Sequence, residues 1–200
     1  MSLKYTDVEL DKITASKYQQ HLLVNYEKQR MNIQTPWMTL THYGIPKCDK
    51  FHTTEESRRY LQIPLNDDKF IEFIHSLDEY FNSENFRNTC LNEKQRSFNY
   101  MTIFKEGKNN YPPSMKIKMH IYDDIIKTDV YHKIDGEHKE CDLQNMDDVK
   151  RAIPYMSECI FIFKVNRIWF MSKNYGVQLK LMKVLIKPPT KENTTIEFIE

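Results

Sequence analysis

Basic side chains alternate with apolar ones in one stretch near the middle of the sequence. Lys116 and Lys118 are interleaved with Met115, Ile117 and Met119. Successive side chains of a β-strand point to opposite faces, so the two lysines would share the face opposite the apolar residues. Such a face neutralises phosphates if its partner is a polyanion, and is an ordinary solvated strand face otherwise. The stretch therefore indicates a phosphate-binding face or plain solvent exposure.

More cations follow near the ends of the predicted C-terminal strands. Lys164 closes the polar side of one strand, Arg167 lies in a predicted turn, and Lys173 flanks the next hairpin. Lys180 and Lys183 flank a predicted β-bulge, which would turn Lys183 towards the side of Lys180. Charged hairpin tips are usually only solvated, but several tips of one sign favour a common anionic partner.

Flat side chains on which unpaired bases stack would complete such a site. The candidates are Trp37, Tyr43, Tyr111, Trp169 and Tyr175. Tyr111 is the best of them, because it lies in the proline-bounded loop 105–113, which also carries Lys105 and Lys108. A large aromatic residue within a strand is often a core residue instead, and this alternative applies to both tryptophans.

Known catalytic motifs are absent from the sequence. It contains no Walker loop, no GxSxG, no HExxH and no nucleophile with a visible base partner. The carboxylate pairs 67–68, 123–124 and 147–148 would suit a metal nuclease, but two of them open predicted helices, where acids satisfy free N–H groups. The 4 cysteines show no CxxC pair and no ligand spacing with the 7 histidines. We therefore expect no enzyme activity, no metal and no cofactor.

The net charge of +1 conceals a polarised charge distribution. Residues 155–189 contain six Lys and Arg against one acid, whereas residues 123–148 contain nine acids against three lysines. The first region can present a positive face to a polyanion. No apolar run approaches the roughly 20 residues that cross a bilayer, and residues 1–10 lack the pattern of a secretory signal. We expect no membrane partner and an intracellular location.

Two helices are predicted. Phe70, Ile74, Leu77 and Phe81 recur at helical spacing after an N-cap at residues 66–68, which predicts a helix over 68–81. A short helix over 147–152 is predicted to stop before Pro154.

Most of the remaining sequence alternates with the period of a strand. Residues 61, 63 and 65 and residues 115, 117, 119 and 121 predict half-buried strands. The Asp135-Gly136 dipeptide predicts a hairpin turn. Three consecutive antiparallel strands are predicted over 159–165, 168–171 and 175–186, with a bulge near residues 181–182, where the apolar phase changes. Residues 18–31 have the composition of a helix but also alternate like strands.

Three stretches together resemble the single-stranded-DNA-binding proteins of nucleocytoplasmic large DNA viruses, which are related in fold to phage replication proteins that bind displaced strands. They are residues 22–26 followed by 31–38, residues 111–118, and residues 168–170 followed by 175–183. The resemblance covers nearly the whole chain, in order. In that family the N-terminal motif lies on strands, so we expect a hairpin turning at residues 27–29.

The resemblance implies a mainly β (α+β) fold: an OB-type antiparallel β-barrel with extra N-terminal strands. It also implies sequence-independent binding of single-stranded DNA in viral replication, recombination or repair. The length predicts a single domain over 1–189, and the acidic tail over 190–200 resembles in kind the tails through which other single-strand binders engage replication proteins. The expected location is a cytoplasmic viral factory or the nucleus, or the virion. Oligomeric state stays open.

Two alternatives remain. The first is an OB-like protein-interaction scaffold of the viral replication or transcription machinery that does not itself bind nucleic acid. The second is a divergent nuclease.

Overall fold

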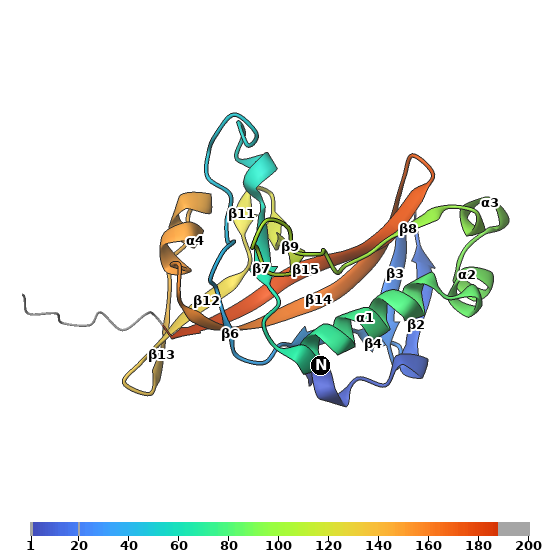
Figure 1. Ribbon diagram of the computed structural model, residues 1–200, viewed down its shortest axis with the longest axis horizontal. Helices are drawn as coiled ribbons and strands as arrows, with labels where there is room; N and C mark the ends of the chain where they lie inside the picture. Colours follow the sequence, from blue (N-terminus) through green and yellow to red (C-terminus); the bar gives the residue numbers. More distant parts are fainter. Residues whose placement is uncertain (1, 20, 188–200) are drawn as a thin grey trace, which may run out of the picture.

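Two long strands form the centre of the sheet (Figure 1). They belong to a computed structural model that describes residues 2–19 and 21–187. β14 (Glu158–Met171) and β15 (Asn174–Lys187) are antiparallel and are joined by a turn at Ser172-Lys173, where φ is 49° and 61°. Positive φ at both central residues gives the turn the same twist as the two strands. The result is one continuous ribbon.

Each edge of this ribbon pairs with a series of shorter strands. β14 pairs with β6 (Met38–Thr39), β5 (Asn32–Gln34) and β3 (His21–Tyr26). β15 pairs with β12 (Asp129–Ile134), β9 (Ser114–Met119) and β8 (Asn99–Met101). The 13-stranded sheet is completed by β1 (Ser2–Lys4), β2 (Ile13–Tyr18), β4 (Gln29–Arg30), β7 (Tyr60–Pro64) and β13 (Glu137–Glu140). A separate hairpin consists of β10 (Ile121–Tyr122) and β11 (Ile125–Ile126).

The strand directions correct part of the predicted fold. The chain is mainly β, as expected, and the sheet curls into a half-barrel. However, β8, β9 and β12 all run parallel to β15, and β1 runs parallel to β5, so the sheet is mixed and not antiparallel. The reason is that each of these strands is separated from its partner by a long stretch of chain, which allows a crossover. The assignment to the OB type stays a prediction.

The helices cover one face and the two ends of the sheet (Figure 1). α1 (Asp68–Asn82) buries Phe70, Ile74, Leu77 and Phe81, as its spacing predicts, and Asp67 caps it by accepting a hydrogen bond from the Phe70 N–H at 2.8 Å. The remaining helices are α2 (Glu84–Cys90), α3 (Glu93–Arg96) and α4 (Met146–Ala152), with 3₁₀ turns at Tyr5–Asp7, Leu10–Lys12 and Glu56–Arg58. Among the helices described, none has the length and apolar character needed to span a membrane.

Two β-bulges bend the central ribbon, one on each strand. The pairing register passes from Ile162–Lys183 to Phe163–Leu181, which leaves Met182 without a partner and confirms the predicted bulge. On β14 the register passes from Val165–Leu179 to Arg167–Gln178, so Asn166 is the extra residue. The prediction of separate strands over 159–165 and 168–171 is wrong, because the polar residues 166 and 167 mark this bulge and not a turn.

The short hairpins follow the predictions. β3 and β4 are joined at Glu27-Lys28, where φ is 47° and 65°, so the ambiguous N-terminal segment is a hairpin. Asp135-Gly136, with φ of 51° and 85°, joins β12 to β13. The predicted strand around residues 61–65 is β7, and the one around residues 115–121 is β9, which ends at Met119, so Ile121 belongs to β10. The predicted short helix is α4. The predicted tail over 190–200 lies outside the described residues.

Candidate nucleic-acid interface

A row of lysines crosses the face of the sheet opposite the core. Lys164 on β14 pairs with Lys180 on β15, and Lys180 pairs with Lys118 on β9. Paired residues of neighbouring strands project to the same face, and neighbouring strands are about 4.8 Å apart. Asn32 continues the row beyond Lys164, and Tyr60 continues it beyond Lys118. Like charges directly opposite one another destabilise a sheet, so this row is unfavourable for folding by itself.

The cations of this face lack acidic partners. Within residues 2–19 and 21–187, no carboxylate lies within 4.0 Å of the charged groups of Arg30, Lys116, Lys118, Lys164, Arg167 and Lys180. We call these six residues the basic face. Burial lowers the pKa of Lys180, and the nearby charges of Lys164, Arg167 and Arg30 lower it further. The pKa of Lys164 is lowered by burial and by Arg30. Burial is thus the main cause of both pKa shifts, and the neighbouring positive charges add to it.

The bulge on β14 holds one of these cations in place. Arg30 donates two hydrogen bonds of 2.8 Å from Nη2 to Asn166, one to its carbonyl oxygen and one to Oδ1. Gln178 Oε1 accepts hydrogen bonds from Asn166 Nδ2 and from Arg167 Nε, each at 3.1 Å. Arg30 Nη1 and Asn32 Oδ1 are buried without a partner among the described residues. The hydrogen bonds to the bulge thus fix the guanidinium groups of Arg30 and Arg167 on the basic face.

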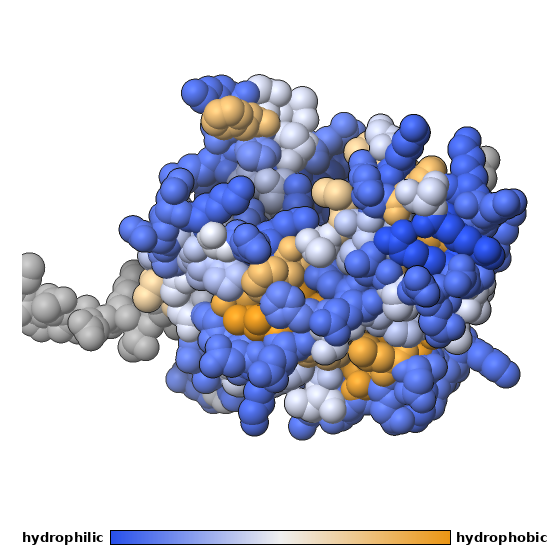
Figure 2. Space-filling model, turned by 45° about the vertical axis from the view of Figure 1, so that its right-hand side comes forward, coloured by the Kyte–Doolittle hydropathy of each residue, from blue (hydrophilic) through white to orange (hydrophobic). Residues whose placement is uncertain are grey.

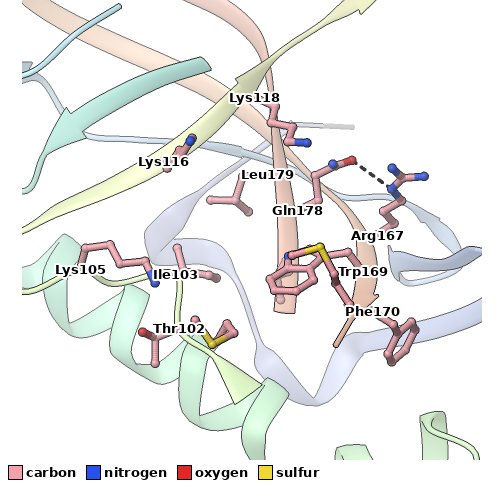
Figure 3. A pocket seen from close by; sticks show the side chains of 13 residues that line it. Thr102, Ile103, Lys105, Lys116, Lys118, Arg167, Trp169, Phe170, Gln178 and Leu179 are labelled. Atoms are coloured by element: carbon pink, nitrogen blue, oxygen red, sulfur yellow. Dashed lines mark hydrogen bonds between the residues drawn. The ribbon is translucent and has the colours of Figure 1, made fainter. Parts of the chain in front are cut away.

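A groove of about 550 Å³ opens beside the basic face (Figure 3). Its lining consists of Met101, Thr102, Ile103, Lys105, Lys116, Lys118, Arg167, Trp169, Phe170, Met171, Val177, Gln178 and Leu179. Most of these side chains are apolar, whereas the four cations lie around them. A second hollow, of about 440 Å³, is lined by Lys116, Lys118 and Lys180 together with Tyr60. Lys116 and Lys118 line both spaces, so the groove and the basic face are continuous.

Trp169 lies flat against the backbone of the neighbouring strand. Its register partner is Gly176, and a Cβ at position 176 would come within 2.7 Å of Trp169 Cζ2 and 2.9 Å of the Met101 carbonyl oxygen. Glycine is therefore required for this close approach. The indole is half-buried, with one side on Gly176 and another lining the groove. This geometry suits a stacking platform.

Other predicted residues lie near the site in different ways. Lys116 Nζ is 3.4 Å from the centre of the Tyr60 ring. The residue as a whole is exposed, but burial of its ammonium group lowers the pKa of Lys116, and the charge of Lys118 lowers it further. Lys105 lines the groove. Tyr111 is 51% exposed, and its ring lies 5.7 Å from that of Tyr43, whose hydroxyl donates to the Pro112 carbonyl oxygen at 2.8 Å. These two tyrosines form an aromatic cluster outside the groove lining.

Several predicted residues lie away from this site. Lys183 Nζ is 3.8 Å from Asp129 Oδ2 and 4.8 Å from the Tyr131 ring, so Lys183 is on the same face as Lys180 but has an acidic partner. Trp37, at the far end of the ribbon, packs beneath Lys187. Lys108 lines a different hollow, near α1, and Lys173 lies in the exposed turn between β14 and β15.

The prediction for Tyr175 is wrong. Its side chain is 0% exposed, its hydroxyl donates to the Phe81 carbonyl oxygen at 2.9 Å, and its ring packs against Tyr100. A base cannot reach this ring. Arg167 lies within β14 and not in a turn, yet it remains part of the basic face.

Sequence reasoning missed four residues of the site: Arg30, Asn32, Tyr60 and Gln178. A usable signal existed for three of them. Asn32 stands between the buried Met31 and Ile33. Arg30 precedes Met31 and Tyr60 precedes Leu61, so strand alternation places both opposite buried residues. Nothing in the sequence indicates that Gln178 joins Asn166 to Arg167.

The carboxylate pairs have structural roles. Asp67 caps α1, and Asp148 accepts hydrogen bonds from the Gln144 and Asn145 N–H groups at the start of α4. The pair 123–124 forms the turn between β10 and β11. Across the described part of the chain, no three His, Cys, Asp or Glu side chains gather as metal ligands do.

No family model matches the chain. A protein of Acanthamoeba polyphaga mimivirus described as uncharacterized is 23% identical over 220 residues, which cover 82% of this chain and 54% of that protein. The chain thus spans about half the length of this relative.

Two solved structures are similar. One is a single-stranded DNA-binding protein from bacteriophage Enc34, with a TM-score of 0.44, 13% identity and coverage of 91% of this chain and 95% of that chain. The other is the same phage protein in complex with single-stranded DNA, with a TM-score of 0.45, 12% identity and coverage of 88% and 94%.

Proposed function

We propose that the chain binds single-stranded DNA along the basic face. The supporting observation is the row Lys164–Lys180–Lys118, three like charges paired directly across three strands without an acidic partner among the described residues. Such a row costs folding free energy, by about 0.2–1 kcal/mol for each like-charged pair. A polyanion reverses this cost, because each phosphate that a lysine neutralises releases condensed counterions.

An unpaired strand fits better than a duplex. The groove beside the basic face has an apolar lining that includes Trp169, and it is accessible from the same face as Lys118 and Arg167 (Figure 3). In a duplex the bases are paired and stacked internally, so only the phosphates would be available to this face. In a single strand the bases are free to stack on aromatic side chains.

The proposed biological role is taken from the resemblance of the sequence to the viral single-stranded-DNA-binding proteins. We propose that the protein acts in viral DNA replication, recombination or repair, in the cytoplasmic viral factory or in the nucleus of the infected cell. Contacts with replication proteins through residues 190–200 belong to the same proposal.

The rival function, an interaction scaffold, needs a surface that suits a protein partner. On the face drawn in Figure 2, hydrophobic residues form small separate patches within a largely hydrophilic surface. Large exposed apolar patches are the usual mark of a protein interface. The apolar patches on the drawn face are small, whereas the six cations of the basic face lack acidic partners among the described residues. This contrast favours the nucleic-acid function over the scaffold.

The test measures the anisotropy of a fluorescent oligo-dT at several salt concentrations. We expect affinity to fall with salt, with a slope of about −0.7 for each phosphate neutralised, and duplex DNA to bind more weakly. Lys118→Glu should abolish most of the binding, whereas Lys133→Glu, on the exposed end of β12, serves as the matched control and should not. Affinity that is independent of salt, or a preference for duplex, would overturn the proposal.

A further inference from the structure

The outer edge of β15 contains a gap between two strand partners. β8 pairs with residues Asn174 to Gly176, and β9 pairs with Lys180 and Leu181. Residues 177–179 thus have no strand partner on this edge within the described chain. Peptide groups of a strand point alternately to its two edges, so the gap leaves backbone hydrogen-bonding groups facing the groove.

The groove beside this gap has the size and chemistry of a nucleotide site. Its volume of about 550 Å³ is within the range of about 300–1,000 Å³ that is typical of small-ligand pockets. Ile103, Leu179 and Trp169 supply apolar surface, and Lys105, Lys118 and Arg167 supply positive charge around it (Figure 3). An apolar space bordered by cations suits a flat heterocycle that is attached to a phosphate chain.

Both walls of the groove are held rigidly. On one side the Trp169 indole lies against Gly176, where even an added Cβ would come within 2.7 Å of its Cζ2 atom. On the other side the N–H groups of Ile103 and Phe104 donate to the buried carboxylate of Asp78 at 2.7 and 3.0 Å. A preorganised space needs little ordering when a ligand enters it, which favours binding.

We propose that the groove receives one unpaired nucleobase of the bound strand, stacked on Trp169 and hydrogen-bonded by the free backbone edge of residues 177–179. This inference rests on the proposed function and adds to it a base-reading position. The remaining bases lie along the basic face, where the strand is held by its phosphates. The protein then distinguishes bases at one position of an otherwise sequence-independent contact.

The first experiment uses fluorescence and leaves the groove intact. The chain has 2 tryptophans, so Trp37→Phe makes Trp169 the only tryptophan, and selective excitation of the indole reports on this residue. We expect oligo-dT to quench this emission, and an abasic strand of equal length, which has the phosphates but no bases, to bind without quenching it. Homopolymers of the four bases should differ in affinity.

The second experiment compares the affinities of these two strands in variants. Trp169→Leu and Gly176→Ala should each weaken oligo-dT binding about 5- to 150-fold, as the loss of one base stack does, and leave abasic binding unchanged. The matched control is Trp37→Leu at the far end of the ribbon, which should change neither affinity.

The outcomes separate this inference from the proposed function. The groove is not the base site if both strands bind but Trp169 emission does not respond. The same conclusion holds if Trp37→Leu, and not Trp169→Leu, removes the preference for the strand with bases. In both cases the proposed function survives. If neither strand binds, the proposed function fails, and the inference fails with it.

Discussion

The hydroxyl of Tyr100 donates a hydrogen bond of 2.6 Å to Oδ1 of Asp78, a carboxylate on α1 that is only 6% exposed. The same carboxylate accepts from the backbone N–H groups of Ile103 and Phe104, so it fixes the segment between β8 and the groove. Burial and the Asp78 charge both raise the pKa of Tyr100, which keeps this hydroxyl a donor.

Asp78→Ala should therefore destabilise the protein by about 2–4 kcal/mol, because it leaves one buried and two partly buried donors without an acceptor. Urea unfolding measures this change. Glu79→Ala, an exposed neighbour on the same helix, is the control and should have little effect. Equal stability of the two variants would mean that the carboxylate does not anchor this segment.

Lys180→Gln should have opposite effects on stability and binding. It removes the central charge of the row and with it the repulsion from Lys164 and Lys118, so the free energy of unfolding should rise by about 0.2–1 kcal/mol. Affinity for oligo-dT should fall, and the salt slope should decrease by about 0.7. Thermal unfolding and anisotropy check the two parts, and a less stable variant would contradict the repulsion.

Affinity for oligo-dT should decrease as pH rises above neutrality. The pKa values of Lys116, Lys164 and Lys180 are lowered from 10.5, so in the free protein these lysines lose their protons at lower pH than ordinary lysines do. Phosphates bind the protonated form, so binding takes up protons and weakens as pH passes upward through the lowered pKa values.

Anisotropy titrations between about pH 7 and 10 measure this effect. Lys164→Arg together with Lys180→Arg should flatten the dependence, because guanidinium groups stay charged over that range. An unchanged pH profile in the double variant would show that these two ammonium groups do not titrate with binding.

Tyr111 and the lysine pair of β9 should affect binding differently. Replacing Lys116 and Lys118 with Ala should lower both the affinity and the salt slope, the latter by about 1.4 if each lysine neutralises one phosphate. Tyr111→Ala should lower affinity at an unchanged slope, because a stacking contact releases no counterions. Intact affinity in both variants, with folding preserved, would place the site elsewhere.

The local elements could be predicted from the sequence because their signals are local. The helical spacing of Phe70 and Ile74, the Asp135-Gly136 turn and the phase change at residues 181–182 each depend on a few neighbouring residues. Parallel pairing of β8, β9 and β12 with β15 depends on contacts between distant residues, and nothing in the sequence specifies it. The missed bulge at Asn166 appears in the sequence only as a pair of polar residues.

The site was predicted where alternation alone decides which face a side chain occupies. Lys116, Lys118 and Lys180 lie opposite buried neighbours and were found. Tyr175 shares the phase of the buried Leu179, so the same rule would have identified it as core, but its aromatic character suggested stacking instead. That Trp169 lines a groove depends on the gap in the edge of β15, which is a property of the tertiary structure.

The position of the central ribbon in the chain constrains the order of folding. β3, β5 and β6 join the sheet through β14, and β8, β9 and β12 join it through β15. The ribosome makes all six of these strands before it makes the ribbon. Until residues 158–187 emerge, strand pairs such as β2–β3 and β7–β9 have no central ribbon to join, and their open edges expose the nascent chain to aggregation. Assembly of the sheet can therefore begin only after the ribbon has been made, because its two edges pair with strands that precede it in the sequence.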